Sequence, residues 1–366
     1  MPETKKYKIC LVGNMFGRGG SERAHSNLSK FFHKQGIEVH NVIFEDGVEY
    51  DFSGKLLNLG RVKHTTVYGK INRYKLLYDY IKKHGFDYVI DLRYRGTFYG
   101  EYVLAKLIFG QTNYIPSIRG FRLYGYFTDK DFIAKRLFTK AYAIVAVSKE
   151  MEKEVLLKYG YQNLTTIYNM VETDTIRALS DEKITENLDF PYIMTLGRMH
   201  PDNIKQQDEI IKAYSRSVLP QKGIKLLLVG DGEKRKDFEQ LTKELNLEDK
   251  VIFTGFKANP YPYLKKAEFM VLASKNEGFP NVLLESFACE TPVVSYDCKT
   301  GPNEIITHNH NGLLVEDQNP QKLTEAMNLM VENQELYQFC KSNTLTTALQ
   351  FSPENIGKQW LELMKY

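Results

Sequence analysis

Two carboxylates, Glu277 and Glu285, flank the part of the sequence with the clearest capacity for chemistry. Gly278 and Pro280 mark a tight turn between them, and proline suits the first turn of a helix, so we expect a helix to begin near Asn281. Free N–H groups at a helix start favour an anion such as a diphosphate. The segment therefore predicts a phosphate-binding turn with an acid on each side.

The two acids have different predicted tasks. Glu285 lies one helical turn beyond Asn281 on the same face, where a carboxylate can accept hydrogen bonds from the two hydroxyls of a ribose. Glu277 lies in the loop, on the side where the hydroxyls of a sugar would be. Taken singly, Glu277 as a surface loop residue and Glu285 as a solvated helix position are open alternatives. The order of strand, turn and apolar helix favours the ligand site.

Short apolar runs alternate with amphipathic segments along the whole chain, which predicts parallel sheets built from βαβ units. We expect helices at 21–35, 73–83 and 149–159. In the first half we expect strands at 8–14, 38–45, 88–92, 114–119, 142–148 and 164–168. In the second half we expect strands at 192–197, 225–230, 251–254, 269–273, 292–295 and 312–315.

The polar stretch Leu179–Phe190 has no apolar period and is predicted to link two domains, 1–185 and 186–366. The fold class is then α/β, with two doubly wound, Rossmann-like domains whose ligand crevices face each other across a cleft. The last segment, 352–366, can pack on either domain, a return to the N-terminal one included.

Charge is unevenly distributed although the net value is only +4. Residues 1–185 carry 29 Lys and Arg against 20 Asp and Glu, whereas residues 186–366 carry 20 against 25. The first domain is therefore expected to face something anionic. No stretch has the length of a signal-peptide core or a membrane span, and the four cysteines show no framework, so we expect a cytoplasmic protein with reduced thiols.

The segment 277–285 resembles the Glu-x7-Glu signature of the retaining family 4 glycosyltransferases, which have the two-lobed GT-B fold. The resemblance is dense over residues 192–316 and sparser in the first half. Its other parts are Asn259-Pro-Tyr-Pro-Tyr-Leu, Thr300-Gly-Pro-Asn-Glu-Ile-Ile, Asn311-Gly-Leu-Leu-Val and Gly19-Gly-Ser-Glu-Arg23.

The resemblance implies a role for each matching residue. Arg198 and Lys205 would bind the diphosphate of a nucleotide sugar and Glu277 would position the sugar, and these three form the predicted catalytic set. Lys205 departs from the family pattern, because it follows Arg198 by seven residues where about five are usual. The full set of predicted donor-binding residues is Gly19, Gly20, Arg198, Lys205, Lys257, Glu277, Gly278, Phe279, Asn281, Val282 and Glu285.

The first half carries weaker signals. Family members often place a His near the end of one first-half strand, whereas this chain has Arg119 in the comparable stretch, which leaves the sugar contacts of that domain open. Arg93, Arg95 and Arg119 are predicted acceptor-binding residues. For Arg93 and Arg95, solvated loop arginines are an equally open interpretation.

Bases alternate with aromatic residues between Arg119 and Phe127. This pattern suits a peripheral contact with a membrane at the inner face of the cell membrane. A folded loop with its aromatic rings in the core is the alternative, and RNA binding would look similar locally.

The resemblance implies transfer of a hexose or N-acetylhexosamine, with retained configuration, from a UDP-sugar co-substrate to a cell-envelope glycan: a lipid-linked oligosaccharide, a lipopolysaccharide or a capsule. We expect no cofactor, no metal and no nucleic-acid partner. Asp129 and Asp131 are interpreted as acids at the start of a helix, and His308 and His310 have no third metal ligand nearby. A two-lobed binding protein without transferase activity is the alternative. A nicotinamide oxidoreductase is disfavoured because the dinucleotide fingerprint is missing.

Overall fold

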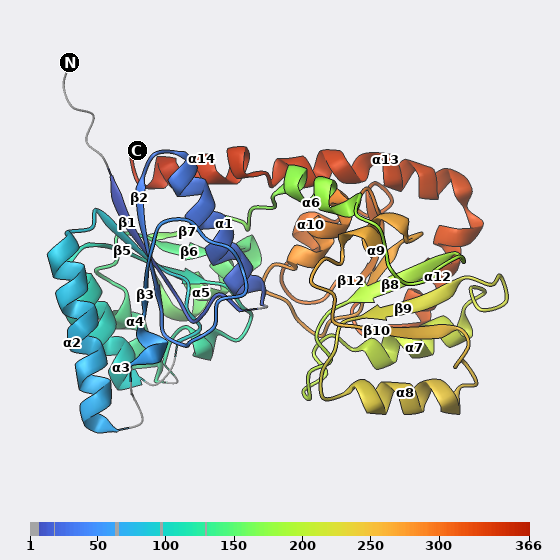
Figure 1. Cartoon of the computed structure of the whole chain (residues 1–366), viewed down its shortest axis with the longest axis horizontal. Helices are drawn as coiled ribbons and strands as arrows, with labels where there is room; N and C mark the ends of the chain where they lie inside the picture. The colour runs from blue at the N-terminus through green and yellow to red at the C-terminus, as the bar shows by residue number, and fades with distance from the viewer. Residues whose placement is uncertain (1–6, 18, 63–65, 96–97, 129) are drawn as a thin grey trace, which may run out of the picture. The chain divides into compact units, whose positions relative to one another are not determined.

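The computed structural model describes residues 7–17, 19–62, 66–95, 98–128 and 130–366. It divides into two compact units. The first unit comprises residues 1–170 together with 353–366, and the second comprises residues 171–352. Each unit contains one parallel sheet covered by helices (Figure 1). The predicted fold class of two parallel-sheet, Rossmann-like domains is thereby confirmed.

The first unit holds a seven-stranded sheet in the order β3-β2-β1-β4-β5-β6-β7. Its strands are β1 (Lys8–Gly13), β2 (Glu38–Ile43), β3 (Lys55–Asn58), β4 (Tyr88–Asp91), β5 (Asn113–Ile118), β6 (Ile144–Ala146) and β7 (Leu164–Thr166). Its α-helices are α1 (Gly20–Lys34), α2 (Val67–His84), α3 (Phe98–Val103), α4 (Asp131–Leu137), α5 (Lys149–Tyr159) and α14 (Pro353–Leu363). Short 3-10 or π turns occupy Leu59–Arg61, Leu104–Ile108, Phe109–Gln111 and Leu123–Gly125.

The second unit holds a six-stranded sheet in the order β10-β9-β8-β11-β12-β13. Its strands are β8 (Tyr192–Leu196), β9 (Lys225–Val229), β10 (Val251–Gly255), β11 (Met270–Leu272), β12 (Val293–Tyr296) and β13 (Gly312–Val315). Its helices are α6 (Thr173–Ser180), α7 (Gln207–Arg216), α8 (Arg235–Glu244), α9 (Tyr261–Lys266), α10 (Asn281–Ala288), α11 (Pro302–Ile305), α12 (Pro320–Glu332) and α13 (Gln334–Gln350).

The division between the units falls at residues 170 and 171, earlier than the predicted 185 and 186. The reason is α6, which packs on α9 and α10 and so belongs to the second unit. Ile176 buries the apolar face of α6, and the Asn259 amide donates to the Leu179 carbonyl at 2.9 Å. The polar stretch after α6 carries no strand or helix, but it is not where the packing changes.

The C-terminal helix α14 packs against α1 in the first unit, where the red and blue ends of the chain lie side by side (Figure 1). Trp360 of α14 is 2% exposed, and its ring centroid lies 6.5 Å from that of Phe32 in α1. The Tyr142 hydroxyl donates to the Leu363 carbonyl at 3.1 Å, which fixes the end of the helix. Apolar packing and a carbonyl contact therefore join residues 353–366 to the first unit.

The sequence missed one strand and placed one helix start too late. β3 is a short edge strand in which no residue is fully buried, so it lacks the apolar run by which the others were found. α2 begins at Val67, six positions before the predicted start, because the Thr66 side chain caps it by accepting from the Gly69 N–H. Its first turns are exposed and therefore lack the apolar period that was sought.

His25 of α1 gives the first unit a measurable acid sensitivity. Its side chain is buried at 1% exposure and bonded to Asn41, and burial lowers its pKa to about 3. The unfolded chain binds this proton at about pH 6.5, so the folded state loses stability as pH falls below that value. Between pH 7.5 and pH 5 we expect a loss of about 2 kcal/mol in the free energy of unfolding.

The single Trp360 lies in the same unit and reports its unfolding by fluorescence in urea. The pH-dependent loss should be absent from His25→Gln and present in His33→Gln, an exposed position on the same helix. Equal pH dependence in His25→Gln and the wild type would contradict the assignment.

Candidate functional site

The two candidate sites lie where each parallel sheet reverses its strand order. In the second unit, β8 and β11 are neighbours although β9 and β10 separate them in the chain. In the first unit, β1 and β4 are neighbours in the same way. Loops that leave the C-terminal ends of such strand pairs diverge and form a ligand crevice between them. Arg198, Lys205 and Glu277 lie in the loops after β8 and β11, at the crevice of the second unit.

Glu277 and Lys205 form the centre of the second unit's site. The Lys205 ammonium lies 2.5 Å from the Glu277 carboxylate, and the Ser274 hydroxyl donates to the same oxygen at 2.6 Å. The Glu277 side chain is 11% exposed, so its alternative interpretation as a surface loop residue is wrong. The Lys205 side chain is 30% exposed, which leaves the ammonium within reach of solvent.

The longer spacing between Arg198 and Lys205 is absorbed by the backbone. Asn203 and Gln206 adopt left-handed conformations with φ of 49° and 47°, which turn the chain back toward the sheet. The Lys275 N–H donates to the Ile204 carbonyl at 2.8 Å and ties this loop to the one that carries Glu277. Lys205 therefore contacts Glu277 although its spacing from Arg198 departs from the family pattern.

Arg198 is the solvent-exposed cation of this site. Its side chain is 68% exposed and lies 3.0 Å from the carboxylate of Glu233, in the loop after β9. A pair between two exposed groups contributes little stability, so the guanidinium can exchange this partner at low cost. Glu233 was not among the residues predicted from the sequence. The sequence feature that could have indicated its loop is Gly230, because a Cβ there would lie 2.1 Å from the Gly197 carbonyl oxygen and because its φ is 138°.

Thr300 and Gly301, in the loop before α11, stabilise the turn that carries Glu277. The Thr300 hydroxyl donates to the Glu277 carbonyl, and Gly301 has a φ of 99°. A Cβ at Gly301 would lie 2.5 Å from Pro280, so only glycine allows this approach. The Phe279 side chain is buried, with its ring centroid 5.5 Å from that of Phe351. The distant Thr300-Gly301 pair thus fixes the shape of the predicted phosphate-binding turn.

Helix α10 begins at Asn281, as predicted, and its N-cap residue Pro280 makes no side-chain cap. Gly278, Asn281 and Val282 are partly buried in this turn. Glu285 is 7% exposed, so its alternative interpretation as a solvated helix position is wrong. The Lys257 ammonium is bonded to Glu186 within the second unit and lies 5.6 Å from the centroid of the Tyr263 ring.

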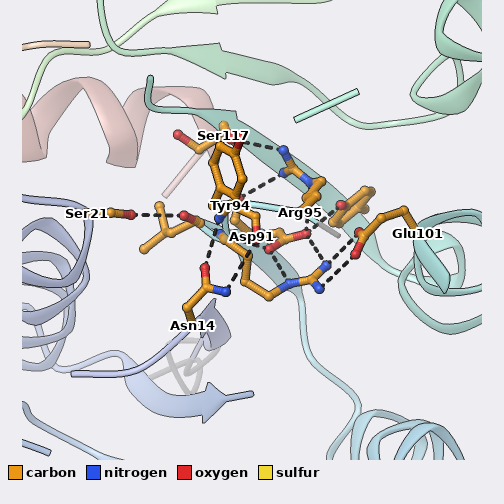
Figure 2. A network of polar contacts seen from close by, with 10 residues as sticks. Asn14, Ser21, Asp91, Tyr94, Arg95, Glu101 and Ser117 are labelled. Atoms are coloured by element: carbon orange, nitrogen blue, oxygen red, sulfur yellow. Dashed lines mark hydrogen bonds and ion pairs between the residues drawn. The ribbon is translucent and has the colours of Figure 1, made fainter. Parts of the chain in front are cut away.

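The corresponding edge of the first unit is a closed ionic network (Figure 2). The Arg93 guanidinium lies 2.9 Å from Asp91 and 3.0 Å from Glu101. Arg95 lies 3.4 Å from Asp91 and donates to the Ser117 carbonyl at 3.2 Å. Burial alone would raise the pKa of Asp91, but Arg93 and Arg95 lower it to about 2. Two cations and two anions neutralise one another inside the protein.

Arg93 and Arg95 are each 3% exposed, so the interpretation as solvated loop arginines is wrong. Both guanidinium groups bind partners within the unit, and an acceptor-binding role stays a prediction that this geometry does not favour. The network instead fixes the loop after β4. The Tyr94 N–H donates to the Asn14 side chain at 2.9 Å, and the Ser21 hydroxyl donates to the Leu92 carbonyl at 3.1 Å. Figure 2 shows Asn14 and Ser21 at this network. In the sequence, these two residues flank Gly19 and Gly20.

The loop between Arg119 and Phe127 is partly in the core. Tyr126 and Phe127 are 4% and 3% exposed, as the alternative interpretation had it, whereas Tyr124 is 58% exposed. No helix in the described part of the chain has both the length and the apolar character to cross a bilayer.

Among the described residues, no three metal-ligating side chains are grouped around one point. Asp131 begins α4, as expected of a helix-start acid, and Asp129 lies outside the described residues.

Comparison with known families decides the identity of this arrangement. Residues 18–175 match the model of Glycosyltransferase Family 4, and residues 177–346 match that of Glycosyl transferases group 1. The chain belongs to the family 4 glycosyltransferases. The two matches together span most of residues 18–346 and so reach into both units.

This glycosyltransferase is similar to two named relatives and to one solved structure. It is 32% identical over 237 residues to the N-acetylgalactosamine-N,N'-diacetylbacillosaminyl-diphospho-undecaprenol 4-alpha-N-acetylgalactosaminyltransferase of Campylobacter jejuni, covering 64% of this chain and 62% of that protein. It is 30% identical over 204 residues to the lipopolysaccharide core biosynthesis glycosyltransferase LpsE of Rhizobium meliloti, covering 56% of this chain and 58% of that protein. The matches thus span about three fifths of each relative.

The fold is that of Anabaena HepE, whose structure in complex with UDP superimposes with a TM-score of 0.79 at 20% identity. The superposition covers 98% of this chain and 99% of HepE.

The buried network of the glycosyltransferase should control the stability of its first unit. Asp91→Asn leaves Arg93 and Arg95 short of one negative charge in a buried site, and we expect a loss of about 3 kcal/mol in the free energy of unfolding. Urea titration followed by Trp360 fluorescence measures it. Arg61→Ala, which removes an exposed pair with Asp46 in the same unit, should cost less than about 1 kcal/mol. Equal losses in the two variants would contradict the role of the network.

Proposed function

We propose that this glycosyltransferase transfers a hexose or N-acetylhexosamine from a UDP-sugar to a cell-envelope glycan, with retention of the anomeric configuration. The observation that carries the donor half is the meeting of Lys205, Glu277 and the start of α10 at the crevice of the second sheet. HepE, which has the same fold, binds UDP. The acceptor half is supported by the relatives that act on a diphospho-undecaprenol-linked glycan and in lipopolysaccharide core biosynthesis.

In the proposed mechanism the donor diphosphate lies at the N-terminus of α10, with Lys205 and Arg198 beside it. As the bond between the sugar and the diphosphate breaks, negative charge grows on the departing phosphate, and two cations and the helix start stabilise it. Arg offers a planar fork and Lys a mobile point charge, which together suit a diphosphate without a metal ion. The oxygen of the acceptor hydroxyl bonds to the anomeric carbon on the face that the diphosphate leaves, and the departing phosphate accepts the proton of that hydroxyl.

Glu277 positions the sugar in this scheme. Its carboxylate is oriented by Ser274 and Lys205, so it presents a fixed acceptor for sugar hydroxyls. Glu285, one turn into α10, holds the ribose. No metal and no cofactor has a part in these steps.

The donor site is tested with UDP and a panel of UDP-sugars. UDP at 100 times its Kd should stabilise the protein by about 2.7 kcal/mol, seen as a higher unfolding midpoint. Arg198→Gln and Lys205→Ala should each weaken UDP binding about tenfold, because each removes a charge-assisted contact. Glu277→Gln should retain UDP binding and lose turnover of the sugar.

Lys212→Ala is the matched control for the donor site, since Lys212 of α7 pairs with Glu209 in the same unit. The donor assignment fails if UDP does not bind or if both Arg198→Gln and Lys205→Ala bind it as the wild type does. Binding of UDP-sugars without any turnover, in the presence of glycan acceptors, would point to a binding protein instead.

A membrane-facing surface is the remaining part of the proposal. Val67, Tyr68 and Ile71, in the first turns of α2, are 76%, 81% and 61% exposed, with exposed Lys70 and Lys75 beside them. Rings and aliphatic side chains among lysines suit the surface of an anionic bilayer, so we place the peripheral contact here rather than between Arg119 and Phe127.

Sedimentation with liposomes tests the membrane contact. The protein should bind anionic vesicles more than neutral ones at low salt, and Tyr68→Ser with Ile71→Ser should reduce that binding several-fold, because apolar area and lysine charge both contribute. Leu157→Ser, at an apolar position of α5 that is 76% exposed, is the control. Equal binding to neutral and anionic vesicles would refute the contact.

A further inference from the structure

The three arginines predicted to bind an acceptor have partners within the first unit, whereas an aromatic ring beside them is open to solvent. Arg119 follows β5, and its guanidinium donates to the Ser117 hydroxyl at 3.3 Å and to the Asn169 side chain. Tyr94, in the loop after β4, is 47% exposed although it adjoins the buried ionic network (Figure 2). An exposed ring at the C-terminal edge of a parallel sheet lies where ligands of this fold bind.

Contacts with Tyr126 and Gly125 fix the position of the Tyr94 ring. The ring packs edge-on against the buried ring of Tyr126, with the two centroids 5.4 Å apart. It also lies against Gly125, where a Cβ would come within 1.9 Å of two of its carbon atoms. The Arg95 N–H donates to the Gly125 carbonyl at 2.6 Å, which joins the loop after β4 to the turn Leu123–Gly125. A side chain that is already ordered loses little conformational entropy when a ligand binds.

Tyr124, in the same turn, supplies a second exposed ring. It is 58% exposed, and its hydroxyl is hydrogen-bonded to that of Tyr94; burial and then this neighbour raise the pKa of Tyr94. The face of an aromatic ring is electrically negative, and the carbon-bound hydrogens on one face of a sugar ring are weakly positive. Two adjacent exposed tyrosines therefore suit the apolar face of a sugar.

Polar side chains next to the two rings can bind the hydroxyls of such a sugar. Asn14 accepts from the Tyr94 N–H at 2.9 Å, and its amide lies 3.4 Å from the exposed carboxylate of Glu45. Arg122 is exposed and close enough to Tyr94 to lower the pKa of its hydroxyl. A carboxylate accepts hydrogen bonds from hydroxyls, and a guanidinium donates to them. One acid and one base together favour a sugar over an anionic bilayer, which attracts surfaces rich in lysine and arginine.

We propose that Tyr94 and Tyr124 form a stacking platform for one sugar ring of the acceptor glycan, with Glu45 and Arg122 binding its hydroxyls. The inference rests on the proposed function for the nature of the ligand, a glycan acceptor. Tyr94 follows β4, at the reversal between β1 and β4. The buried pairs around Asp91 then serve the site indirectly, because they fix the backbone that carries Tyr94.

The probes are methyl glycosides of glucose, galactose, N-acetylglucosamine and N-acetylgalactosamine, with binding to the full chain measured by saturation-transfer NMR. At least one of them should bind, with the strongest transfer to the carbon-bound hydrogens on one face of its ring. Tyr94→Ala should weaken that binding about fivefold, because the stacking surface is lost. Tyr94→Phe keeps the ring, so it should bind within about twofold of the wild type.

Two further variants separate stacking from a folding defect. Tyr124→Ala should weaken glycoside binding by a similar factor while it leaves the ring that packs on Gly125 in place. Tyr366→Ala is the matched control, because Tyr366 is 51% exposed in the same unit and packs on Tyr7, next to the start of β1 at the opposite edge of the sheet. It should bind the glycosides as the wild type does.

The proposal is overturned if the wild type binds none of the glycosides, or if Tyr94→Ala and Tyr124→Ala both bind them as the wild type does. It is also overturned if Tyr94→Phe loses as much binding as Tyr94→Ala, or if Glu277→Gln alone abolishes binding, since the sugar would then lie in the second unit. Loss of binding to anionic vesicles in Tyr94→Ala, with glycoside binding intact, would make the pair a membrane contact instead.

The donor site and the platform fail separately. If UDP does not bind, the proposed donor site is wrong, whereas glycoside binding that depends on Tyr94 still stands. If UDP binds and the glycosides do not, the platform is wrong and the donor site stands.

Discussion

The contact between Lys205 and Glu277 depends on the order of the strands rather than on any local feature of the chain. The two residues are 72 positions apart, and they meet because β11 returns to lie beside β8 after the chain has built β9 and β10 on the other side. A parallel sheet with this reversal must open its loops in opposite directions at that point. Ser274 belongs to one of the two loops that leave there, and Thr300, which follows β12, contacts the same loop through the Glu277 carbonyl.

The same constraint acts in the first unit with the opposite electrostatic result. The loops after β1 and β4 meet at the reversal, but the charges there are closed into pairs at Asp91 and Glu101. A neutralised network fixes backbone positions without attracting a ligand, and it holds both ends of the segment that contains Gly19 and Gly20. In the second unit the cations stay accessible, with Arg198 at 68% and Lys205 at 30% side-chain exposure. One sheet edge is thus built for rigidity and the other for exchange of partners.

Most of the architecture could be predicted from the sequence because buried parallel strands appear in it as short runs of apolar residues. β3 and the first turns of α2 were missed because exposed elements lack that pattern. In the second unit, the spacing of Glu277, Pro280 and Asn281 indicated the turn and the helix start, since proline and glycine act locally. The roles of Arg93 and Arg95 could not be predicted, because their burial depends on Glu101 and Ser117 reaching them from α3 and β5. A sequence shows which side chains are charged but not which charges are already paired.

The pair of Lys205 and Glu277 also limits what Glu277 can do in the reaction. Lys205 has three N–H donors, and the contact with Glu277 uses one of them, so a phosphate oxygen can bind the ammonium without displacing the carboxylate. The Glu277 carboxylate accepts from both an ammonium and the Ser274 hydroxyl, so one of its oxygens is already held by two donors. Glu277 therefore fits a fixed hydrogen-bond acceptor better than a general base. This assignment agrees with the proposed scheme, in which the departing phosphate receives the proton of the acceptor hydroxyl.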